Sequence, residues 1–129
     1  MPPKVAVSWG ELIDKITILE IKRERLRDPA QIANVKHEHA VLTAARDDAL
    51  PAGADIAADT DALRTVNAAL WDIEDDIRDC ERNSEFGRTF IELARAVYRT
   101  NDRRAAIKRR INDALGSDIV EEKSYTDYN

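Results

Sequence analysis

The chain contains few of the residues that define disulfide-bonded or turn-rich proteins. Its 129 residues include one cysteine, four glycines, four prolines, two Phe, two Trp and three Tyr. The single cysteine, Cys80, excludes an internal disulfide and a cysteine-rich metal site, and it suits a reducing compartment. Because glycine and proline mark turns, their scarcity favours an all-α fold with short connections. The core is therefore expected to be mainly aliphatic.

The sequence also lacks a long apolar run and an excess of basic residues. No segment approaches the roughly 18 apolar residues of a membrane span, and the first residues, MPPKVAVS, are too short and too polar for a signal peptide. We therefore expect a cytoplasmic protein without a membrane span. The formal net charge of −5 argues against nucleic acid as a partner, because phosphate binding needs exposed basic residues that are not already neutralised.

Hydrophobic periodicity and capping signals predict a single helical domain that spans residues 1–129. The expected architecture is an antiparallel bundle of about four helices with an extended C-terminal tail. In chain order, the expected elements are an N-terminal extension at 1–8, helices at 9–26 and 29–49, a loop at 50–62, a third helix that includes Leu63–Cys80, a fourth helix that opens at Ser84–Phe86 and ends at Leu115, and a tail at 117–129. The fourth helix carries polar residues at its centre, so it is either one long helix or two segments that meet near Thr100–Asp102.

The first helix begins with an unusual sequence, VSWGEL. Ser8 and Glu11 form a capping box, so the helix starts at Trp9. Gly10 is disfavoured in helices, which indicates that another backbone packs closely against it or, as the alternative, that a ligand does. The N-terminus of a helix also favours negative charge. We therefore expect the tail segment Glu121–Tyr125 to return to Trp9 and Gly10.

Charge is distributed unevenly between the last two predicted helices. Residues 55–85 hold ten acidic residues and three arginines, and residues 86–115 hold eight basic and three acidic residues. An antiparallel hairpin would set these opposite charges beside each other, which biases the register of its two helices. An alternative is that a row of arginines binds phosphate or carboxylate groups, with Arg95 and Arg99 as the anion-binding candidates.

Polar residues flank the apolar seam of the third helix and lie opposite others at the middle of the fourth helix. Their spacing permits a polar pocket between the two helices, and polar contacts that fix the register are the alternative interpretation. The candidate ligand-binding residues are Trp71, Glu74, Arg78, Tyr98 and Asn101.

Acidic residues on the third helix form the candidate metal site. The stretch WDIEDDIRDCE places four aspartates three or four residues apart or side by side, namely Asp72, Asp75, Asp76 and Asp79. Clustered carboxylates are typical ligands of Mg²⁺, and a solvated acidic face is the alternative interpretation. No nucleophile and base pair, glycine-rich phosphate loop or histidine-rich metal spacing is present. The sequence therefore predicts no catalytic residue, and no cofactor apart from the Mg²⁺ alternative.

Four segments carry a resemblance to a known family: SWGELIDKITILEIK, LWDIEDDIRDCE, ARAVYRTNDRRAAIKRRIN and EEKSY. Together they resemble an uncharacterised bacterial family of small helical proteins, a domain of unknown function sometimes associated with glycan or lipopolysaccharide genes. The resemblance covers nearly the whole chain. It implies the extent of the domain, and it implies no activity, substrate or catalytic residue.

Two functional hypotheses follow from these patterns. The leading one is a non-enzymatic helical module that associates with itself or docks on another protein, because the apolar residues of the first helix occupy more sides than a four-helix monomer is expected to cover. The alternative is a small helical enzyme or sensor that binds a phosphorylated or sugar-nucleotide ligand with Mg²⁺. In that alternative, the aspartates hold the metal and the two arginines hold the anion.

Overall fold

Four α-helices and an extended tail make up the computed structural model, which describes residues 1–129. The helices are α1 (Trp9–Arg25), α2 (Pro29–Ala49), α3 (Ala57–Arg82) and α4 (Arg88–Leu115). There are no strands, and the predicted all-α bundle is confirmed. None of the helices has the length and apolar character needed to cross a membrane.

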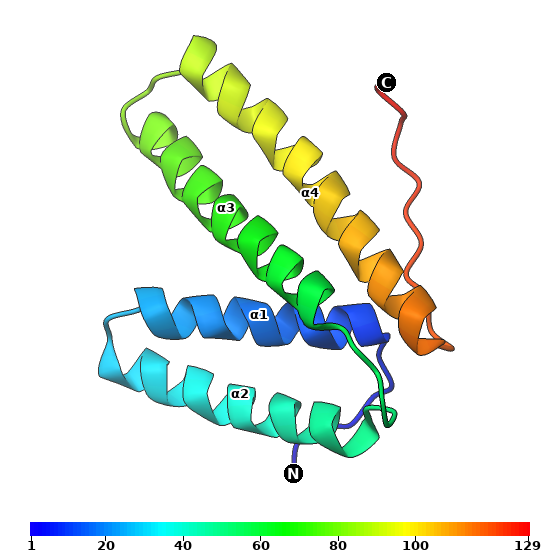
Figure 1. Ribbon diagram of the computed structural model, residues 1–129. Coiled ribbons are helices and arrows are strands. Elements are labelled where there is room, and N and C mark those ends of the chain that lie inside the picture. The colour runs from blue at the N-terminus through cyan, green and yellow to red at the C-terminus, as the bar shows by residue number, and fades with distance from the viewer.

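The four helices are arranged as two hairpins that cross each other. The α1–α2 hairpin lies across one end of the longer α3–α4 hairpin, and the other end of the longer hairpin projects away from it (Figure 1). Helix α1 packs against all three other helices, whereas α2 packs against α1 alone among the helices. We call the projecting part, residues 73–99, the arm, and the part crossed by α1 the base.

The core lies at the base, where α1 meets α3 and α4. Its fully buried residues are Ile13, Ile16, Leu63, Ile107 and Ile111. Burying an aliphatic side chain contributes about 1.5 to 3 kcal/mol relative to leaving it exposed, so these residues hold the two hairpins together. Because α1 contacts three helices, one chain covers the wide apolar surface of α1. The expectation that a four-helix monomer leaves this surface open is therefore wrong.

Several predicted helix ends agree with the structure. The Ser8 hydroxyl accepts a hydrogen bond from the Glu11 N–H at 3.1 Å, and the Asp28 carboxylate caps α2 by accepting from the Gln31 N–H at 3.2 Å. Helix α4 ends at Leu115 because Gly116 adopts a left-handed conformation with φ of 60°. Between its ends α4 is continuous through Thr100, so the first of the two alternatives for this helix holds.

The loop predicted at 50–62 is shorter in the structure, because α3 already begins at Ala57. The carboxylate of Asp55 accepts a hydrogen bond from the Ala57 N–H at 3.2 Å, and Asp59 adds negative charge to the first turn. Both features stabilise a helix start. Asp55 and Asp59 of the predicted loop therefore act at a helix N-terminus.

The connection between α3 and α4 also differs from the prediction, since α4 begins at Arg88 and not at Ser84–Phe86. Ser84 has a positive φ of 53°. Its N–H donates to the Glu81 carbonyl, and the Glu85 N–H donates to the Cys80 carbonyl. These two bonds form a Schellman motif that closes α3, so residues 84 and 85 belong to the end of α3. Cys80 itself is buried, with 5% of its surface exposed, as predicted.

Candidate functional site

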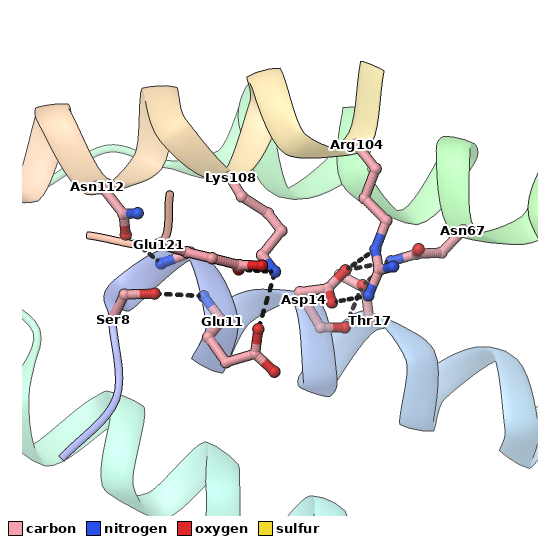
Figure 2. A network of polar contacts seen from close by, with 10 residues as sticks. Ser8, Glu11, Asp14, Thr17, Asn67, Arg104, Lys108, Asn112 and Glu121 are labelled. Atoms are coloured by element: carbon pink, nitrogen blue, oxygen red, sulfur yellow. Dashed lines mark hydrogen bonds and ion pairs between the residues drawn. The ribbon is translucent and has the colours of Figure 1, made fainter. Parts of the chain in front are cut away.

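A buried carboxylate on α1 is the centre of a polar network at the base (Figure 2). Asp14 is 1% exposed. Both of its carboxylate oxygens accept hydrogen bonds from the Arg104 guanidinium of α4. Asn67 of α3 donates to Asp14 at 2.9 Å and to the Thr17 hydroxyl at 3.0 Å. Three helices therefore meet at one carboxylate, and this fixes the position at which the hairpins cross.

The charges in this network stabilise one another. A carboxylate without a partner is strongly disfavoured in a protein interior, and a bidentate guanidinium is among its best partners. The hydrogen bonds from Arg104 to Asp14 raise the pKa of Arg104, against the opposing effect of burial. The Arg104 guanidinium therefore stays charged beside the buried carboxylate.

One turn further along α4, Lys108 connects α1 with the C-terminal tail. Its ammonium group donates to Glu11 and to Glu121, each at 2.8 Å. Lys108 is only 8% exposed. Burial lowers the pKa of Lys108, but the hydrogen bonds to the two carboxylates together outweigh it and the pKa is raised. The hydrogen bond from Lys108 in turn lowers the pKa of Glu121.

The start of α1 packs directly on the backbone of α4, which explains Gly10. A Cβ atom at this position would lie 2.5 Å from the carbonyl oxygen of Lys108. The Gly10 N–H donates to the Asn112 side-chain oxygen at 2.7 Å, and the Trp9 N–H donates to the Ser117 hydroxyl at 3.3 Å. The prediction of a close backbone is therefore confirmed.

The C-terminal tail returns to this region, although not through the contacts that we expected. It runs beside α4 in the direction opposite to that helix (Figure 1). Glu121 binds Lys108 and not the free N–H groups at the start of α1, and Tyr125 is 80% exposed. Further along the tail, the Tyr128 hydroxyl donates to Asp102 of α4.

A pocket of about 260 Å³ lies between the outer face of α4 and the tail. We call it the tail pocket, and it is lined by Ala105, Ala106, Lys108, Arg109, Asn112, Glu121, Glu122 and Lys123. Arg109 of α4 and Glu122 of the tail contact each other across the pocket. This contact is long, because Arg109 lies 3.4 Å from each carboxylate oxygen of Glu122. The buried Lys108 of the network forms part of its wall.

A separate polar cluster joins α1 with α2 and α3. Glu20 accepts a hydrogen bond from Arg64 and lies 3.1 Å from Nε2 of His39. Burial raises the pKa of Glu20, but the bonds to His39 and Arg64 outweigh it, so the pKa is lowered overall. His39 is thus a half-buried, hydrogen-bonded side chain, and it anchors α2 to α1.

The five residues predicted to form a polar pocket make separate contacts in the structure. Trp71 packs on Arg25 of α1, whose guanidinium carbon lies 5.8 Å from the ring centroid. Glu74 and Arg78 pair with each other along α3 at 3.4 Å. Tyr98 packs edge-on against Tyr128 of the tail, with the two ring centroids 5.1 Å apart. Asn101 is half-buried. No hydrogen bond or ion pair connects the α3 residues of this set with Tyr98 or Asn101.

The four aspartates proposed as Mg²⁺ ligands do not converge either. Asp72 pairs with Arg25, and Asp79 pairs with Arg82 at 3.2 Å. Asp75 and Asp76 are exposed and have no ion-pair partner. No group of three or more His, Cys, Asp or Glu side chains has the spacing of a metal site, and two of the four carboxylates are engaged by arginines.

The two arginines proposed as an anion clamp do lie on one surface. Arg95 and Arg99 line a shallow depression of about 250 Å³ on α4, together with Arg103. Neither Arg95 nor Arg99 has a carboxylate within 4.0 Å. Their charges are therefore available to a ligand or to another surface.

The opposite charges of α3 and α4 pair with each other at one place only. Arg110 of α4 binds Asp59 of α3 at 3.1 Å, near the base. Within the arm every ion pair stays on a single helix, as in the pairs Arg82–Asp79, Arg78–Glu74 and Arg88–Glu92. The predicted electrostatic pairing along the hairpin is thus absent from the arm.

The network at the base was not predicted as a unit, although the sequence contains a signal for it. Gly10, Asp14 and Thr17 are four and three residues apart, so they share one side of the helix with the apolar residues Ile13 and Ile21. Lys108 and Asn112 follow Arg104 at steps of four on α4. Two polar rows of this kind indicate facing helices, but the pairing becomes visible only when α1 is placed on α4.

Comparisons with known proteins identify a family and nothing closer. No curated protein and no solved structure matches the chain. The sequence pattern of a family of unknown function, DUF6165, matches residues 3–128. This range includes all four helices, the network at the base and nearly all of the tail, so the chain belongs to the family of unknown function DUF6165.

Proposed function

We propose that the protein is a non-enzymatic helical interaction module that associates with a second copy of itself through the arm. The observation that supports this most strongly is the separation of unpaired charge on the arm. Asp75 and Asp76 of α3 have no ion-pair partner within the chain, and neither have Arg95 and Arg99 of α4. The two helices of the arm therefore carry complementary charge that the monomer leaves unmatched.

The apolar side chains of the arm support the same proposal. A pair of helices covers only the sides that face each other, and helical bundles usually need further helices to bury a seam. Cys80 is the one buried residue in the arm. Phe86 is 54% exposed and Ile91 is 55% exposed. A second arm would remove this apolar surface from water.

Charge complementarity selects the geometry of the complex. Two arms can pack with α3 of each copy against α4 of the other. The aspartates of each copy then face the arginines of the other copy, so the dimer contains two such contacts. A two-fold axis makes both contacts identical, which is the usual symmetry of a homodimer. The result is a four-helix arrangement formed by two arms.

Light scattering coupled to gel filtration tests the proposal, because a monomer has a mass of 14.6 kDa. We expect twice this mass at micromolar concentration. Reversing the acidic side with Asp75→Lys and Asp76→Lys, or the basic side with Arg95→Glu and Arg99→Glu, should give monomers. An equal mixture of the two reversed proteins should restore the dimer, because each helix then meets a partner of opposite charge.

Glu38→Lys provides a matched control, since Glu38 is exposed on α2 and forms no ion pair. This control should dimerise like the parent protein. A parent protein that remains monomeric up to high micromolar concentration would exclude the second copy as the occupant of the arm. A dimer that survives both charge reversals would place the interface elsewhere.

We also propose a bacterial cytoplasm as the setting of this module. The bacterial origin rests on the family resemblance of the sequence. The compartment rests on Cys80, a single buried thiol without a disulfide partner.

A further inference from the structure

The tail pocket contains a hydrogen-bond donor that has no partner within the chain. Asn112 is 4% exposed. The Gly10 N–H must bond to its oxygen, so the orientation of the amide is fixed and the NH₂ group is turned to the other side. This NH₂ group forms no hydrogen bond within the chain, and Asn112 lines the pocket. Because this group opens onto the pocket, it can donate to an acceptor that binds there.

Two cationic residues of the same pocket are also unpaired or only loosely paired with a carboxylate. Lys123 has no carboxylate within 4.0 Å, and its ammonium nitrogen lies 5.8 Å from the centroid of the Tyr125 ring. Arg109 is held only by the two contacts of 3.4 Å to Glu122. The pocket therefore holds three donor groups that are unpaired or only loosely paired, namely Asn112, Arg109 and Lys123, and two of them are cationic.

We propose that the tail pocket binds a small phosphate monoester. A phosphoryl group presents three terminal oxygens, which match an amide NH₂, an ammonium group and a guanidinium group from three directions. The donors are Asn112, Lys123 and Arg109. A volume of about 260 Å³ is larger than a free phosphate ion needs, and it leaves room for a short organic substituent.

The tail takes part in binding, because one wall of the pocket belongs to it. Glu121 is anchored by Lys108 at 2.8 Å, so the tail stays docked at this residue. Glu122 makes only the long contacts to Arg109, and a phosphoryl group bound there replaces it. The carboxylate of Glu122 is thus a competitor that weakens binding. This site lies outside the arm, so it does not depend on self-association.

Isothermal titration calorimetry of the full chain at constant ionic strength tests the site. The probes are inorganic phosphate, sulfate and glycerol 1-phosphate. We expect binding of glycerol 1-phosphate with one site per chain, and weaker binding of inorganic phosphate. Equal heats from all three probes, or none from glycerol 1-phosphate, would overturn the proposal.

Substitutions assign the binding to the named donors. Asn112→Asp keeps the acceptor for Gly10 but replaces the NH₂ donor with a carboxylate oxygen that repels a phosphoryl group, so we expect an affinity at least about tenfold lower. Lys123→Ala should have a similar effect without changing the buried structure. Glu122→Gln should bind severalfold more tightly, because the competing charge is gone.

Lys36→Ala is the matched control, since Lys36 is an exposed lysine on α2 without an ion-pair partner. It should bind like the parent protein. If Lys36→Ala and Lys123→Ala reduce the affinity equally, the effect comes from net charge and the proposed pocket is wrong. The charge-reversed arm variants should keep their affinity for the monoester, so a failure of the dimer proposal and a failure of this site are distinguishable.

Discussion

The base and the arm belong to the same helical hairpin but use charge in opposite ways. At the base, Asp14 and Lys108 are almost fully buried, and each is paired with residues from other segments of the chain. In the arm, charged side chains are exposed and pair only with neighbours on the same helix. Buried pairs define where segments meet, whereas exposed pairs of this kind contribute little.

This difference explains why the position of α1 on α3 and α4 is fixed by specific contacts, while the outer surface of the arm is exposed to solvent. A helix that crosses two others must satisfy every polar group that it buries there. The arm has no third helix, so nothing selects partners for its charges within the chain. Substitutions at the two regions should therefore differ strongly in their effect on folding.

The largest effect is expected at the buried carboxylate. Asp14→Asn leaves the Arg104 guanidinium without its counter-charge in a half-buried position. Removing one partner of a buried pair typically lowers the free energy of unfolding by about 3 kcal/mol or more. Urea denaturation followed by circular dichroism measures this loss.

Asp75→Asn is the matched substitution in the arm, and it should change the free energy of unfolding by no more than about 0.5 kcal/mol. Measurements at a concentration where the protein is monomeric keep association out of this comparison. Equal losses for both aspartates would contradict the division of the hairpin into a base and an arm.

The next effect is expected where α1 touches the backbone of α4. Gly10→Ala places a methyl group 2.5 Å from the carbonyl oxygen of Lys108, so the two helices must move apart. Overpacking of this kind lowers the free energy of unfolding by about 1 to 3 kcal/mol. Gly87→Ala is the control, because a Cβ atom there meets nothing within 4 Å and the only expected loss is the preference for glycine over alanine at the N-cap of α4. A Gly10→Ala protein as stable as the parent would show that the helices can separate without loss.

Much of this fold was predictable because it rests on local signals. Capping by Ser8 and Asp28, and the left-handed Gly116, act within one turn, so the sequence contains the whole interaction. The predicted loop puts the start of α3 six residues too late, because Asp55 and Asp59 are equally typical of loops and of helix N-termini.

The candidate site was less predictable because its contacts join residues far apart in the chain. The row Gly10, Asp14 and Thr17 was visible, but its partners depend on the angle at which the hairpins cross. The polar pocket was predicted from an antiparallel hairpin alone. That prediction did not include Arg25 and Tyr128, which contact Trp71 and Tyr98 from α1 and from the tail.

A smaller effect, of opposite sign, is expected at the turn that ends α3. Ser84 adopts a φ of 53°, which costs a residue with a side chain about 1 kcal/mol relative to glycine. Ser84→Gly should therefore raise the free energy of unfolding by about 0.5 to 1 kcal/mol, measured by urea denaturation. Ser117→Gly is a useful contrast, because Ser117 accepts a hydrogen bond from the Trp9 N–H and the exchange should destabilise. A lower stability for Ser84→Gly would mean that the serine side chain contributes to the turn.

The smallest effect is expected from pH, and it concerns the contact between the tail and the base. The pKa of Glu121 is lowered in the folded protein by its hydrogen bond to Lys108. The stabilisation from this hydrogen bond is therefore complete above the pKa that Glu121 has in the unfolded chain. It is lost as the pH falls through the lower pKa of Glu121 in the folded protein. The pKa of Lys108 is raised, so its contribution is complete below the ordinary lysine pKa and is lost only as the pH rises through the raised value. The tail should stay docked between about pH 5 and pH 10.

Nuclear magnetic resonance measures this contact locally. Global stability cannot isolate it, because the pKa of Glu20 is also lowered in the folded protein, so Glu20 contributes to the loss of stability in acid as well. The side-chain carbon shift of Glu121 should titrate below the range of an exposed glutamate, and the tail amides should lose protection from exchange in the same interval. Glu121→Gln should abolish this acid step in the tail and leave the titration of Glu20 unchanged. Because Glu11 still neutralises Lys108 in that variant, the base should remain folded while the tail detaches. If the base unfolds together with the tail, Glu121 is part of the structural network of the base and not a separate attachment of the tail.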